Sequence, residues 1–193
     1  MMKRIAEFIM LMAVAMSCYR TDYSEPFKKR IKDYAGTFFL TEIEWGGLEK
    51  LDLDGDGISS SDIMSEFEAL DQNMYYLQSS KIVSVPDEYS DVNTFLARIP
   101  VQCGFLSDEP AEKNWAQIGY ADTEIVYEFD ESNDVHYYLP SGVKAEYDPL
   151  SCYDPQNMEF KSGQAKYYAE ATFYDFLRNG FVSGPVVFIF ERK

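Results

Sequence analysis

The chain has 193 residues, 46% of them hydrophobic, and its 33 acidic and 17 basic residues give a net charge of −16 at pH 7. A field of that sign repels nucleic acid and anionic membrane surfaces and favours divalent cations or cationic partners, although it also keeps a secreted protein soluble. The length predicts a single domain that buries its own core without cross-links. Because of the negative net charge, we expect no nucleic-acid partner.

The first residues have the order of a secretory signal peptide. Lys3 and Arg4 provide positive charge, residues 8–16 are apolar, and the small Ser17 follows. Nine apolar residues fall short of the roughly 20 that a helix needs to cross a bilayer. We therefore predict that residues 1–17 are removed.

Cys18 directly follows Ser17, and this arrangement resembles a bacterial lipobox, in which the cysteine sulfur is acylated and the chain is cut just before it. The resemblance implies a protein held to the membrane by a lipid anchor alone, with residues 18–23 as its tether; simple secretion is the alternative. No aspartate follows Cys18 immediately, which implies the outer membrane. Residues 24–193 are then the folded domain.

The domain is predicted to begin with a short helix and a strand. Phe27, Ile31 and Tyr34 recur on one helical face, and Gly36 ends the pattern. The apolar period then changes to two, which predicts a strand over 37–45.

An acidic loop, residues 51–62, comes next and resembles an EF-hand-like or dockerin-like calcium loop. Such a loop supplies oxygen ligands from positions 1, 3 and 5, a carbonyl at 7 and an acidic residue at 12, with glycine at 6. The twelfth position here is Ile63, so a shortened loop would close one residue earlier, on an aspartate. The candidate calcium ligands are Asp52, Asp54, Asp56, the carbonyl of Ile58, and Asp62.

The alternative is an acidic turn whose aspartates interact with the N-terminal dipole of a following helix, predicted over 59–70 with a capping box formed by Ser59 and Asp62. Three alternating carboxylates repel one another strongly without a metal, which favours calcium. Nothing around the loop in sequence supplies a base or nucleophile, so we expect a structural ion.

The rest of the chain is predicted to be strands and turns. Strands are expected over 74–85 and 95–105, a hairpin over 123–139, a long loop over 141–163, and two final strands over 166–176 and 182–192. Short antiparallel strands at regular spacing predict an all-β fold, either a barrel or a sandwich.

The sequence contains few residues that suggest catalysis. His136 is the single histidine, and no serine or cysteine nucleophile motif accompanies it, so a structural or exposed histidine is expected. Cys103 and Cys152 remain after removal of the signal peptide, and they either pair or stay as free thiols. We therefore expect no enzyme.

Several segments together resemble the lipocalin-like, or calycin-like, lipoproteins of Gram-negative bacteria: the signal with Cys18, residues 35–38 at the first strand, residues 51–63, and residues 173–176 with 184–193. Lipocalins carry Gly-x-Trp at the first strand, with an arginine near the last strand packed over the tryptophan. The matching residues are Gly36, Thr37 and Phe38, with Arg192 as the arginine, and phenylalanine also offers a face for a cation.

The resemblance implies an eight-stranded barrel that binds a small hydrophobic ligand inside or an envelope protein outside. Two further hypotheses remain. The first is a structural or interaction subunit with a filled barrel. The second is a glycan hydrolase that uses carboxylates from different strands.

Overall fold

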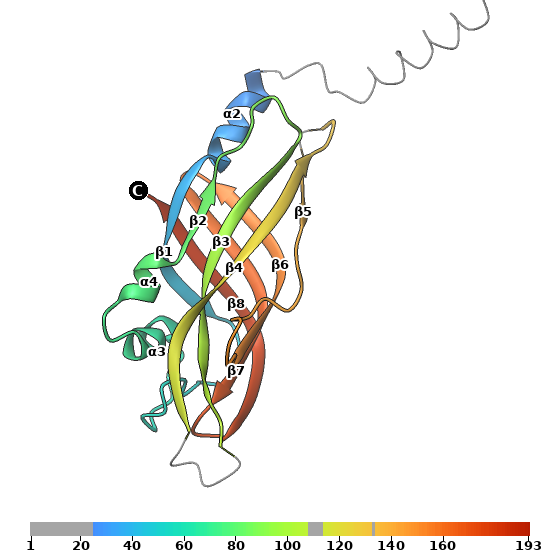
Figure 1. The fold of residues 1–193 in the computed structure, drawn as a ribbon. Coiled ribbons are helices and arrows are strands. Elements are labelled where there is room, and N and C mark those ends of the chain that lie inside the picture. The colour runs from blue at the N-terminus through green and yellow to red at the C-terminus, as the bar shows by residue number, and fades with distance from the viewer. Residues whose placement is uncertain (1–24, 108–113, 133) are drawn as a thin grey trace, which may run out of the picture.

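The computed structural model describes residues 25–107, 114–132 and 134–193, and it is mostly antiparallel β structure (Figure 1). Its strands are β1 (Gly36–Trp45), β2 (Lys81–Ser84), β3 (Val92–Phe105), β4 (Trp115–Phe129), β5 (Val135–Tyr138), β6 (Ser151–Lys161), β7 (Gln164–Asp175) and β8 (Gly180–Arg192). Its helices are α2 (Glu25–Tyr34), α3 (Ile63–Leu70) and α4 (Tyr75–Ser79). Within the described residues, no helix combines the length and the apolar character needed to cross a membrane.

All eight strands belong to one sheet that curls into a nearly closed barrel. The order is β5-β4-β3-β2-β1-β8-β7-β6, and every ladder is antiparallel. β5 and β6 are the two edges of this sheet. The segment between them forms two isolated bridges, Val143 with Tyr153 of β6 and Pro149 with Cys103 of β3. This architecture confirms the predicted all-β antiparallel barrel.

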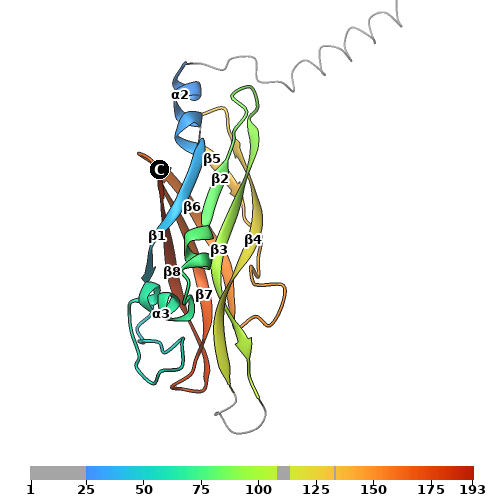
Figure 2. The same cartoon turned by 60° about the vertical axis from the view of Figure 1, so that its left-hand side comes forward.

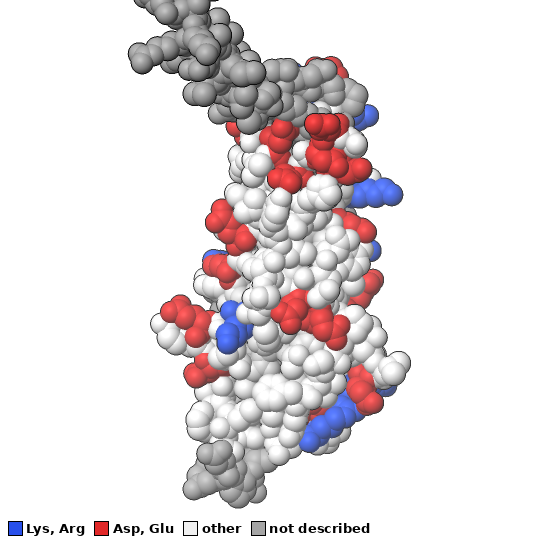
Figure 3. Space-filling model, turned by 90° about the vertical axis from the view of Figure 1, so that its right-hand side faces the viewer, with Lys and Arg blue, Asp and Glu red and all other residues white. Residues whose placement is uncertain are grey.

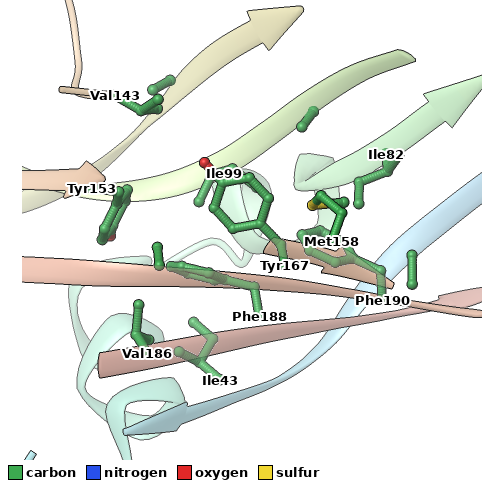
Figure 4. Close-up of a cluster of buried hydrophobic side chains, with 14 of the residues drawn as sticks. Ile43, Ile82, Ile99, Val143, Tyr153, Met158, Tyr167, Val186, Phe188 and Phe190 are labelled. Atoms are coloured by element: carbon green, nitrogen blue, oxygen red, sulfur yellow. The ribbon is translucent and has the colours of Figure 1, made fainter. Parts of the chain in front are cut away.

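Large side chains fill the barrel because alternate residues of each strand point inward. Figure 4 shows Phe188 and Phe190 of β8 beside Tyr167 of β7 and Tyr153 of β6, and all four are fully buried. The ring of Phe188 lies 5.2 Å from that of Tyr153 and 5.9 Å from that of Tyr167. Edge-to-face contacts at these distances are typical of a packed aromatic core.

Helix α2 closes one end of the barrel (Figures 1 and 2). The apolar face predicted for it is buried, and Tyr34 stacks on Tyr127 with ring centroids 5.2 Å apart. The chain then enters β1 at Gly36, whose φ of +127° is a conformation that side chains rarely adopt. A glycine is therefore required at this junction.

The two other helices lie along the outside of β1 (Figure 2). α4 occupies part of the predicted strand over 74–85, so that prediction was wrong for its first half. The cause is the buried carboxylate of Asp71, which accepts N–H bonds from Tyr75 (3.0 Å) and Leu77 (2.8 Å) and so caps a helical turn.

The predicted loop over 141–163 was also wrong, because β6 runs through it from Ser151 to Lys161. A bulge between Pro155 and Asn157 shifts the register against β7. Tyr153 before the bulge and Met158 after it are both buried, but they are an odd number of residues apart. The bulge thus hides the period of two, and the proline further obscures the strand.

Candidate functional site

The acidic loop is rooted in the barrel. Leu51 and Leu53, on either side of Asp52, are fully buried. Leu51 and Ser60 exchange backbone hydrogen bonds of 2.8 and 2.7 Å that close the loop at its base. The acidic loop is therefore closed by hydrogen bonds and anchored in the core, unlike an extended linker.

Within the loop, the aspartates bond to backbone N–H groups. Asp52, 1% exposed, accepts hydrogen bonds from Gly55 (2.7 Å) and Gly57 (3.1 Å). Both glycines have positive φ, +80° and +84°, which the turn requires. Asp56 accepts the N–H of Ile58 at 2.7 Å, and both of these residues are exposed.

Asp62 lies at the start of α3 and serves as its N-cap. Its carboxylate accepts the N–H of Ser65 at 3.1 Å. The helix begins at Ile63 and not at 59 as predicted, because Ser60 is engaged in the bridge to Leu51. The structure thus gives Asp62 a capping contact, and neither Asp62 nor Asp56 belongs to the carboxylate cluster that the structure forms.

The carboxylates that the structure brings together are Asp52, Asp54 and Glu66. One oxygen of each lies within 4.8 Å of the others. Glu66 comes from the buried face of α3, is 7% exposed, and accepts the N–H of Leu53 at 2.8 Å. Sequence reasoning missed Glu66, although an acidic residue on the same helical face as Ile63 and Phe67 was the available signal.

Burial and nearby negative charge perturb the pKa values of Glu66 and Asp52. Burial, together with the charges of Asp54 and Asp52, raises the pKa of Glu66 to about 7. Burial also raises the pKa of Asp52. Carboxylate oxygens, here two from the loop and one from α3, are the hard donors that calcium prefers, and a divalent cation would offset their repulsion. Asp52, Asp54 and Glu66 are therefore the residues that could hold a divalent cation such as calcium.

Without calcium, the free energy of unfolding is expected to fall as the pH rises from about 4.5 to about 7. The folded protein holds the Glu66 proton more tightly than the unfolded chain, whose ordinary pKa is 4.5. This contribution is fully present below pH 4.5 and lost as the pH rises through 7, and it amounts to roughly 3 kcal/mol. Urea melts in chelator across this range measure it.

The comparison that isolates this effect is between two variants of α3. Glu66→Gln should flatten the pH dependence, whereas Glu68→Gln, at an exposed position of the same helix, should leave it unchanged. An unaltered slope in Glu66→Gln would contradict the assignment.

A pocket of about 420 Å³ lies beside the acidic loop. Asp52 and Asp54 form one wall, and Trp115, Phe176 and Leu177 are among the other lining residues. We call this end of the barrel the loop end: the acidic loop, the end of β3, the start of β4 and the β7–β8 turn, opposite α2 (Figure 1). Large apolar side chains are exposed here: Ile58, Phe105, Trp115, Leu177 and Phe181.

Arg178 in the β7–β8 turn ties the loop end together. It pairs with the buried carboxylate of Asp175, bonds to Glu49 at 2.7 Å, and donates to the carbonyl of Lys50 at 2.7 Å. The N–H of Phe176 also donates to the carbonyl of Asp52 at 2.8 Å. These contacts fix the acidic loop against the turn, so the pocket between them is preformed.

Inside the barrel, the buried hydroxyl of Tyr167 has no hydrogen-bond partner among the described residues, whereas the buried hydroxyls of Ser84 and Tyr127 interact with each other. Burial raises the pKa of Tyr127 to about 12. A buried hydroxyl without a partner costs free energy, so such groups are commonly satisfied by an internal water or a ligand.

The remaining candidate residues are dispersed. His136 is exposed on β5 and lies 3.3 Å from a carboxylate oxygen of Asp130. Cys103 and Cys152 are free thiols, and burial raises the pKa of Cys103 to about 11, which makes it unreactive. Cys18, with the signal peptide and tether, lies outside the described residues.

Arg192 makes the contact that the family resemblance implies. Its guanidinium carbon lies 4.9 Å from the centroid of the Phe38 ring, and it donates to the carbonyl of Asp33 at 2.7 Å, at the end of α2. Comparisons with protein-family models, with curated proteins and with solved structures find no match to this chain. The lipocalin-like relationship therefore stays a prediction.

Proposed function

We propose that this protein is a non-enzymatic, lipid-anchored binding protein of the bacterial outer membrane. Its filled barrel is a scaffold, a structural calcium ion stabilises the acidic loop, and the loop end binds an envelope protein. The observation that carries the proposal is the packing of the barrel interior.

The interior supports recognition on the outside. Phe38, Phe95, Tyr127, Tyr167 and Phe188 are each at most 1% exposed and lie along the length of the barrel. A ligand inside would have to displace several of these rings, and each large apolar side chain contributes about 1.5–3 kcal/mol through its burial. A partner bound to the outer surface avoids this cost.

The loop end has the properties of a binding surface. Trp115, Phe105 and Leu177 are exposed there. Exposed large apolar side chains of this kind often anchor a protein interface. The carboxylates of the acidic loop flank them, and acidic side chains also outnumber basic ones on the face shown in Figure 3. The complementary partner presents apolar residues beside lysine or arginine.

The position of this end agrees with the proposal. The tether that would carry a lipid precedes α2, and α2 closes the opposite end of the barrel (Figure 1). The loop end is therefore at the opposite end of the domain from the start of α2, where it can reach a second envelope protein.

A photo-crosslinking amino acid at position 115 tests the proposal in cells of the source organism. We expect one defined protein adduct from this position, and little from the same group at Tyr138, which is exposed on β5. Adding Leu177→Lys should reduce the adduct at least several-fold, because the new charge repels a cationic partner. Equal adducts from both positions, or an adduct insensitive to Leu177→Lys, would contradict a binding surface at the loop end.

A second candidate function is the binding of a small apolar ligand inside the barrel. The buried hydroxyl of Tyr167, which has no partner among the described residues, favours it, because a ligand with one polar group could satisfy this hydroxyl. This candidate requires a cavity beside Tyr167, whereas the filled scaffold does not.

A further inference from the structure

We propose that a pocket on the outside of the barrel binds a medium-chain alkyl carboxylate, a small amphiphile with an apolar chain and an anionic head. The pocket has a volume of about 410 Å³ and is lined by residues of β1 and of the segment from α3 to α4. Figure 2 shows these elements beside one another. This volume is within the range of small-molecule sites. It is separate from the loop end and from the barrel interior.

The lining of this pocket is mostly apolar and adaptable. Phe39 and Leu40 of β1 form one wall, and Met64, Met74 and Leu77 of the helical segments form the other. Methionine side chains are flexible and polarisable, so they adjust to apolar chains of different shape. The chemistry of the wall therefore suits an alkyl chain.

Specific contacts position the backbone on both walls of the pocket. Met74 adopts a left-handed conformation, φ +56°, which is unusual for a side chain of this size, and its N–H donates to the carbonyl of Asp71 at 2.8 Å. On the opposite wall, the register of β1 shifts between Leu40 and Glu42. The N–H of Leu40 donates to the carbonyl of Ser80 at 3.1 Å. These features fix both walls before a ligand arrives.

Charge selects the head group. Seven of the described residues line the pocket, and the charged one among these seven is Lys193, whose ammonium lies 5.2 Å from the ring centroid of Phe39. None of these seven residues is acidic, although the chain has 33 acidic residues. An anionic head beside Lys193 meets its complement here, and the apolar chain extends toward Met64 and Met74.

Methionine methyl groups provide a direct test. Met64 and Met74 line the pocket, whereas Met158 is buried inside the barrel. In protein labelled with ¹³C-methyl methionine, sodium decanoate below its micellar concentration should shift the Met64 and Met74 signals saturably and leave Met158 unmoved. Decanol should bind at least several-fold more weakly, and Lys193→Met should remove that difference.

Two variants test the location. Leu40→Glu should abolish decanoate binding, and Gln78→Glu, at an exposed position of the rim, should weaken it at least several-fold without affecting the fold. Leu96→Glu, on the outer face of β3, is the matched control and should have no effect. A shift at Met158 instead of Met64 and Met74, no saturable shift, or tighter binding of decanol would overturn the proposal.

Discussion

Replacing Gln102 by leucine is expected to lower the free energy of unfolding by about 3–5 kcal/mol. This side chain is fully buried in β3, where its amide nitrogen donates to the carbonyls of Leu53 (2.8 Å) and Tyr174 (3.0 Å). Its amide oxygen accepts the N–H of Tyr174 at 3.0 Å. Leucine fills similar space but leaves the two buried carbonyls without this donor, and each such group costs about 1–3 kcal/mol; the N–H of Tyr174 keeps the carbonyl of Leu150 at 3.1 Å.

The loss should appear in urea unfolding curves as a lower midpoint with an unchanged slope. Gln117→Leu, an exposed position on the adjacent strand β4, is the matched control and should change stability by less than about 0.5 kcal/mol. Gln102 joins the acidic loop, through Leu53, to β7, through Tyr174. A loss of stability below about 1 kcal/mol for Gln102→Leu would mean that these hydrogen bonds do not stabilise the fold.

Calcium is expected to raise the melting temperature of the protein by about 5–10 °C at 100 times its dissociation constant. Binding to the folded state alone stabilises by about 2.7 kcal/mol at that concentration, and 1 kcal/mol corresponds to about 2–4 °C in a domain of this size. Thermal melts with calcium and with chelator, followed by calorimetric titration, should give a stoichiometry near one. Glu66→Gln should remove most of the rise.

Asp62 provides the informative comparison, because the sequence and the structure assign it different roles. If Asp62 caps α3, Asp62→Ala lowers stability by about 0.5–2 kcal/mol but leaves the calcium effect intact. If the loop closes on Asp62, that variant loses calcium binding and Glu66→Gln retains it. The second pattern would contradict the cluster of Asp52, Asp54 and Glu66.

The barrel could be predicted because its strongest strands show a period of two. Val186 and Phe188 on β8, and Ile125 and Tyr127 on β4, alternate with more exposed residues and are buried as expected. The bulge near Pro155 interrupts the period of two in β6. Over residues 74–85, the local pattern of apolar residues does not distinguish the helical turn of α4 from a strand.

The candidate site was predictable in part. The spacing of Asp52 and Asp54 located the acidic loop, because those residues are local in sequence. Glu66 lies 12 residues beyond Asp54, and its approach depends on where α3 begins and which face it buries. The pocket beside Trp115 depends on contacts between segments far apart in the chain. Such contacts leave no periodic signal in a single sequence.

The most direct test of the filled scaffold is the response of the Met158 methyl signal to dissolved xenon. Xenon enters dry apolar cavities large enough to hold it, and Met158 lies inside the barrel (Figure 4). If the interior is filled, this signal stays fixed as the xenon pressure rises. A saturable shift of Met158 would reveal an internal cavity, contradict the filled scaffold, and move the search for function to a ligand held beside Tyr167.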